Sequence, residues 1–104
     1  MIIKLLSQNI EIVKVTGDIN KLNPMYVGTA VFSENKIYVN SDEYNAYSVC
    51  LHELMHFYIE RTGVNQLEKF SKEVTCDLFG YCINQIILEN DVNIFKQIKN
   101  YIEN

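Results

Sequence analysis

The stretch Tyr26–Asn40, YVGTAVFSENKIYVN, consists of two apolar runs on either side of the polar tripeptide Ser33-Glu34-Asn35. Runs rich in β-branched and aromatic residues around a short polar loop are typical of a β-hairpin. The stretch therefore predicts two antiparallel strands. It decides the fold because the chain changes character immediately after it.

Strands are also predicted before the hairpin. The segment Asn9–Asp18, NIEIVKVTGD, alternates apolar and polar residues and ends at the turn signal Gly17-Asp18. Asn23-Pro24 disfavours a helix and predicts a connection. The first residues, MIIKLL, fit an edge strand or the start of a helix, and the pattern leaves that choice open.

Helices are predicted after the hairpin. Asn40 and Glu43 have the spacing of a capping pair and predict a helix that ends at Gly63, a glycine suited to a C-cap. Asn65 and Glu68 repeat that spacing at the start of a second helix.

The second helix is predicted to reach about Glu89, and Asp91 can cap a third. Its apolar stripe is typical of core packing and consists of Ile94, Phe95, Ile98 and Ile102. The chain is thus predicted as one α+β domain over residues 1–104, a small twisted antiparallel or mixed sheet followed by two to three helices. We expect strands at about 1–40, two central helices at about 41–89 and a C-terminal helix at 91–103.

Composition narrows the functional classes. The net charge is −4 and the lysines are dispersed, which argues against nucleic acid as a partner. No apolar run has the length of a membrane span, and the N-terminal MIIKLLSQN is too short and too polar for a signal peptide. The three cysteines lack CxxC spacing and are expected as reduced, buried thiols. We therefore expect a soluble, cytoplasmic protein.

The segment LHELMH contains both histidines of the chain, His52 and His56, with Glu53 directly after the first. Residues four apart share one face of a helix, and two imidazoles at that spacing suit Zn²⁺. Glu53 lies about 100° further round, where a carboxylate can take a proton from metal-bound water. The apolar flanks predict that this helix is buried. The alternative is that both histidines only satisfy hydrogen bonds in the core.

A catalytic zinc site needs a third protein ligand, and the chain has no further histidine. Glu73 and Asp77, in SKEVTCD, are again four apart. Glu73 can supply a carboxylate oxygen, and Asp77 can accept the remaining N–H of a ligand histidine. The alternative is that Glu73 and Asp77 form a solvated acidic stripe. The carboxylates that compete with Glu73 for the role of third ligand are Glu60, Glu68 and Asp91.

HELMH followed by EVTCD resembles the gluzincin pattern of zinc metallopeptidases, HExxH and then ExxxD. The compact form is similar to ImmA/IrrE-type domains of bacterial and phage origin, over roughly residues 26–84. The resemblance implies a minimal zincin-like fold with Glu53 as general base and Asp77 as the partner of His52. It implies these zinc ligands: His52, His56 and Glu73.

The expected function is hydrolysis of a peptide bond in an intracellular protein or peptide substrate. Tyr58 or Tyr81 could stabilise the oxyanion, with Tyr44 and Tyr47 as alternatives. The run KIYVN is a candidate edge strand for binding an extended peptide. The alternative function is a non-catalytic interaction module with a zincin fold, derived from a phage or mobile element, in which Cys76 could close the metal site.

Overall fold

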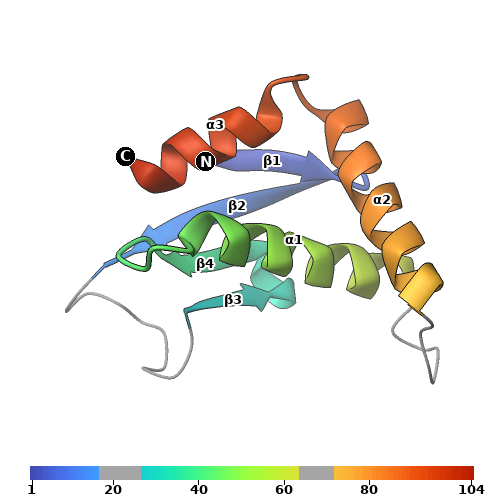
Figure 1. The fold of residues 1–104 in the computed structure, drawn as a ribbon, viewed down its shortest axis with the longest axis horizontal. Coiled ribbons are helices and arrows are strands. Elements are labelled where there is room, and N and C mark those ends of the chain that lie inside the picture. The colour runs from blue at the N-terminus through green and yellow to red at the C-terminus, as the bar shows by residue number, and fades with distance from the viewer. Residues whose placement is uncertain (17–26, 64–71) are drawn as a thin grey trace.

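The computed structural model describes residues 1–16, 27–63 and 72–104, without the side chains of residues 72 and 73. Four strands form one mixed sheet in the order β1-β2-β4-β3, and three helices follow (Figure 1). The predicted α+β class is confirmed. The strands are β1 (Ile2–Leu5), β2 (Gln8–Val15), β3 (Gly28–Val31) and β4 (Lys36–Asn40). The helices are α1 (Ala46–Thr62), α2 (Lys72–Glu89) and α3 (Ile94–Glu103).

The first residues of the chain form a strand, which settles the choice that the sequence left open. Strand β1 pairs antiparallel with β2 at one edge of the sheet. The two-residue turn between them places Leu6 and Ser7 at φ 52° and 63°. Two left-handed residues match the twist of a hairpin but are costly for residues other than glycine.

The second hairpin forms as predicted, with the short 3₁₀ turn η2 (Phe32–Glu34) between β3 and β4. Asn35 closes that turn in the left-handed region at φ 53°. Strand β4 also pairs with β2, in parallel, so it lies inside the sheet. The prediction that KIYVN forms the edge was therefore wrong, because β3 occupies that edge.

Helix α1 begins later than predicted. The side chain of Asn40 accepts a hydrogen bond from the Asp42 amide, which makes a turn, and the helix starts at Ala46. Gly63 ends it at φ 77°, as predicted. The expected turn and connection at residues 17–24 and the capping pair at 65 and 68 lie outside the described residues.

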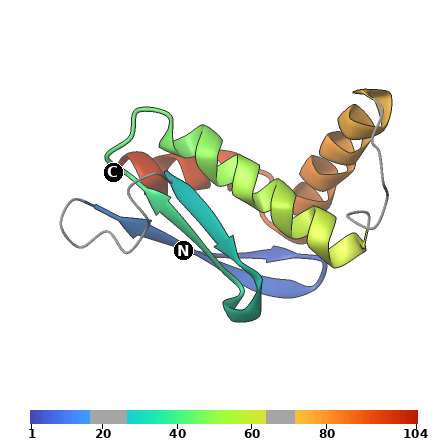
Figure 2. The same cartoon turned by 90° about the horizontal axis from the view of Figure 1, so that it is seen from below.

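The core lies between the sheet and the helices, and Figure 2 shows the helices gathered on one face of the sheet. The buried stripe of α3 is confirmed at Ile94, Ile98 and Ile102, while Phe95 is half-buried. The sheet contributes Ile3, Leu5, Ile10, Ile12, Ile37 and Val39 to this core. Among the described residues, none of the helices has the length and apolarity that a membrane crossing requires.

Candidate metal site

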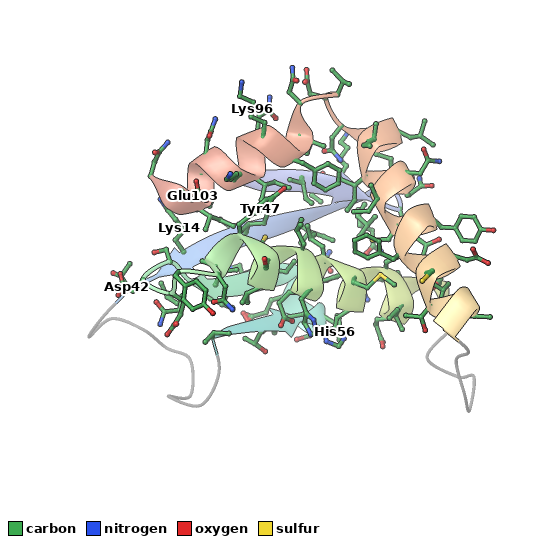
Figure 3. The ribbon with its side chains drawn as sticks, in the orientation of Figure 1. Lys14, Asp42, Tyr47, His56, Lys96 and Glu103 are labelled. Carbon is green, nitrogen blue, oxygen red and sulfur yellow. The ribbon has the colours of Figure 1, made fainter. Side chains whose placement is uncertain are left out.

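The predicted motif lies on the side of α1 that faces the edge strand β3. Figure 3 shows His56 on that side, and Tyr47 on the opposite side of the helix towards α3. His52 and His56 are exposed, whereas Glu53 is only 8% exposed. One helical turn therefore presents two imidazoles to solvent and one carboxylate to the protein.

The geometry of the two histidines fits a shared metal ion. Their Nε2 atoms are 3.0 Å apart, and the rings meet edge to face with centroids 4.6 Å apart. Two nitrogens bound to one tetrahedral zinc at about 2.0–2.1 Å would lie about 3.3 Å apart. Within the described part of the chain, the ligand atoms of His52, Glu53 and His56 all lie within 4.8 Å of one another. This cluster could hold a metal ion.

The expectation that the histidines are buried was wrong, although the apolar flanks of the motif do form core. Cys50, Leu54 and Phe57 are buried on the other side of α1. Positions 52 and 56 lie beside β3, the edge strand, and no further described strand covers them. Buried histidines would need partners inside the protein, whereas these two remain accessible to a metal and to a substrate.

A groove runs along α1 beside β3. It consists of two hollows of about 420 and 410 Å³, and Gly28, His52 and Glu53 line both of them. The first hollow is otherwise lined by Val27, Asn45, Ser48 and Val49. The second is otherwise lined by Thr29, Ala30, Phe32 and His56. The candidate metal cluster therefore lies at the middle of an elongated depression.

Glu53 lies between the groove and the core. Its Cγ is 3.6 Å from the point where a Cβ at Gly28 would be, so the side chain lies against the backbone of β3. On the core side, burial and, to a lesser extent, the charge of Glu53 raise the pKa of the Cys50 thiol to about 12. Cys50 is therefore a protonated core residue beside a carboxylate that still lines the groove.

The free edge of β3 presents backbone groups to the same groove. The Asn40 amide donates to the Val27 carbonyl at 2.9 Å, which makes these two residues a hydrogen-bonded pair. Because such pairs alternate along antiparallel strands, the N–H and C=O groups of Gly28 and Ala30 point away from β4. No described strand pairs with this side of β3.

Contacts made by Arg61 support the part of the groove that Phe32 lines. The Arg61 guanidinium donates to the Phe32 carbonyl at 2.9 Å and to the Asn35 side chain, and it lies over the Phe57 ring. The Phe32 and Phe57 rings meet edge to face with centroids 5.0 Å apart. These contacts fix Phe32, which lines the second hollow.

The other predicted site residues are not joined to this cluster by any described contact. The side chain of Glu73 lies outside the described residues. Asp77 is exposed on α2 and, within the described residues, makes no hydrogen bond with His52, so its role stays a prediction.

The two predicted oxyanion donors lie elsewhere. Tyr81 is 60% exposed on α2. Burial raises the pKa of Tyr58, and the nearby Cys82 and Tyr81 raise it further, which places Tyr58 towards α2. Neither tyrosine is among the described residues that line the groove, so their roles also stay predictions. Of the alternatives, Tyr44 is almost fully exposed and Tyr47 packs against the core.

Sequence reasoning missed several residues that shape the groove. Gly28, Asn45 and Ser48 line it, and Arg61 supports it. One signal was present, because a glycine inside a predicted strand indicates close approach of another group. The positions of the others follow from the packing of α1 on β3, which no local pattern encodes.

Comparison of the chain with protein-family models, curated proteins and solved structures finds no match. The resemblance to the gluzincin pattern therefore stays a prediction.

Proposed function

We propose that this protein is a zinc-dependent peptidase in which His52 and His56 hold the metal and Glu53 is the general base. The observation that carries the proposal is the position of the buried Glu53 carboxylate directly beside two exposed histidines 3.0 Å apart, in the middle of an open groove. A closed structural zinc site has no need of such a carboxylate.

The chemistry follows from the environments of these three side chains. Zinc at this site would lower the pKa of a water molecule and polarise the carbonyl of the scissile bond. Glu53, whose side chain lies against β3, would accept a proton from that water and return it to the leaving amine. Glu73 is the proposed third ligand, with Asp77 supporting His52.

The shape of the groove supports a peptide as the substrate. The outward N–H and C=O groups of Gly28 and Ala30 can pair with an extended chain by strand addition. Such a chain would pass both hollows and cross the His52–Glu53 cluster between them. The lining includes Val27, Val49 and Phe32, which suits apolar side chains.

The test combines metal content with hydrolysis of labelled casein, using protein purified without an affinity-tag metal. We expect about one zinc ion per chain in the wild type, and loss of both zinc and hydrolysis in His52→Ala. Glu53→Gln should keep the zinc and lose roughly 10²–10⁴-fold in kcat. Glu103→Gln, at an exposed position on α3, is the matched control and should leave both properties unchanged.

Two results would overturn the proposal. One is a wild type that takes up no zinc after reconstitution, which would make the imidazole contact a hydrogen bond between the two rings. The other is full hydrolysis by Glu53→Gln. Glu73→Ala tests the third ligand separately, because loss of zinc in this variant is expected only if that carboxylate binds the metal.

An interaction module is the second candidate function, and a feature of α2 favours it. Val74, Tyr81 and Leu88 recur every seven residues on one side of this helix, and Leu88 is 68% exposed. Apolar side chains exposed on one side of a helix can contribute to an interaction surface. Zinc binding without any peptide hydrolysis would favour this function over the peptidase.

A further inference from the structure

Gly28 occupies a position where its backbone conformation does not require glycine. Among the described glycines, Gly63 has a positive φ and Gly28 does not. The reason for the glycine is space. A Cβ at position 28 would lie 2.5 Å from Val49 Cγ1, 3.2 Å from the Tyr38 carbonyl oxygen and 3.6 Å from Glu53 Cγ.

The 2.5 Å contact cannot be relieved by a side-chain rotation at low cost. Val49 lies within α1, and a β-branched side chain in a helix has one strongly preferred χ1 rotamer. The Tyr38 carbonyl belongs to β4 and is fixed by the sheet. A side chain at position 28 therefore forces β3 and α1 apart, at the point where Glu53 lies between them.

We infer that Gly28 is a positioning residue for Glu53: its bare Cα lets β3 lie close enough to α1 to hold the carboxylate between the two hollows. This inference rests on the proposed function for its catalytic consequence. It also explains why Gly28 lines both hollows, since a side chain here would stand between them. Gly28 thus acts through Glu53 and through the openness of the groove.

The test uses Gly28→Ala, Val49→Ala and the double variant, all loaded with zinc. Gly80→Ala is the matched control, because nothing lies within 4 Å of a Cβ at that glycine. Three quantities are measured: zinc content, kcat and KM on labelled casein, and the nuclear Overhauser contact between the Hα of residue 28 and the Glu53 methylenes. The last does not depend on activity.

We expect Gly28→Ala to keep its zinc, because both histidines lie on α1, and to lose roughly 10- to 100-fold in kcat with a smaller change in KM. In this variant the nuclear Overhauser contact between residue 28 and Glu53 should weaken. Adding Val49→Ala removes the closest clash, so the double variant should recover both kcat and the contact to near the values of Val49→Ala alone. A general loss of stability would not produce this pattern of rescue.

Unchanged kcat and an unchanged contact in Gly28→Ala would overturn the inference, as would a double variant that recovers neither. If Gly28→Ala does not fold, the double variant is compared with Val49→Ala, because the double variant carries the alanine at position 28 without the clash. Equal kcat and an equal contact in these two variants would support the inference, and a double variant that lacks both would overturn it. A wild type that binds no zinc and hydrolyses no casein would refute the proposed function. In that case the nuclear Overhauser contact still decides whether Gly28 positions Glu53.

Discussion

Replacement of Glu89 should destabilise the protein by loosening the turn between β1 and β2. Glu89 ends α2, and its carboxylate accepts hydrogen bonds from the amides of Leu6 and Ser7. Both residues adopt the left-handed conformation, which costs about 1–2 kcal/mol for each residue with a side chain. The carboxylate therefore stabilises a turn whose own sequence disfavours it.

The expected loss follows from these contacts. Hydrogen bonds to a charged acceptor contribute about 1.5–3 kcal/mol each, but the Ser7 contact is exposed and the Leu6 contact only partly buried, so we take the lower end. Glu89→Gln keeps one acceptor oxygen and turns an amide towards the other donor. We expect it to lower the free energy of unfolding by about 1–2 kcal/mol. For a domain of this size Tm falls by roughly 4–8 °C per kcal/mol.

The effect should also depend on pH. Burial alone would raise the pKa of Glu89, but hydrogen bonds from Ser7, Gln85 and Leu6, together with the charge of Lys4, lower it below the ordinary 4.5. A carboxyl group whose pKa is lower in the folded state stabilises that state fully above its unfolded pKa. This contribution is lost as the pH falls through the folded pKa. The difference between wild type and Glu89→Gln should therefore be largest at neutral pH and shrink in acid.

Urea unfolding at pH 7 and near pH 3 measures both parts of this prediction. Glu103→Gln, which removes an exposed carboxylate that makes no hydrogen bond within the described residues, is the control and should change little at either pH. Equal stability of wild type and Glu89→Gln at pH 7 would refute the reasoning. So would a difference that stays the same at both pH values, since the lost contacts would then not depend on the charge.

Three further predictions concern packing and thiol reactivity. Ile98→Ala should lower the free energy of unfolding by about 2–5 kcal/mol in urea titrations, because the side chain is fully buried; a loss below about 1 kcal/mol would contradict the packing of α3. Gly80→Ala should raise it by up to about 1 kcal/mol, because alanine favours the helix and nothing lies within 4 Å; destabilisation would contradict that open space. Cys76 is exposed, so the expectation that all three thiols are buried was wrong for this residue. Burial raises the pKa of Cys50 and Cys82 to about 12, so a thiol reagent should modify only Cys76 rapidly in the native protein and all three cysteines after unfolding; rapid modification of a second native thiol would contradict this burial.

Local patterns predicted the elements better than their arrangement. The hairpin around Ser33-Glu34-Asn35 and the stripe of α3 follow from residue type and periodicity, and both form as expected. The start of α1 was placed too early because Asn40 uses its side chain for a turn rather than a cap. Such choices depend on neighbouring structure, since an asparagine suits both roles.

The edge of the sheet shows the same limit at the level of topology. The hairpin predicts that β3 and β4 pair, but it does not say which of them also pairs with β2. The parallel pairing of β2 with β4 decides this, and it joins two strands between which β3 lies in the sequence. Because β3 then becomes the edge, positions 52 and 56 of α1 are exposed rather than buried. The candidate residues were thus evident from their spacing, whereas their environments were not.

This arrangement reconciles two opposite requirements of the proposed chemistry. The metal site must be open to a substrate, whereas a carboxylate that is to act as a base must be held in a fixed position by the protein. Adjacent residues of a helix point about 100° apart, so His52 can face the open groove while Glu53 lies under the edge strand. Glu53 can lie there only if β3 approaches α1 closely at one residue, and the glycine at position 28 permits that approach. The site therefore depends on the hairpin that precedes the helix as much as on the helix itself, and substitutions in β3 should affect hydrolysis without removing the metal.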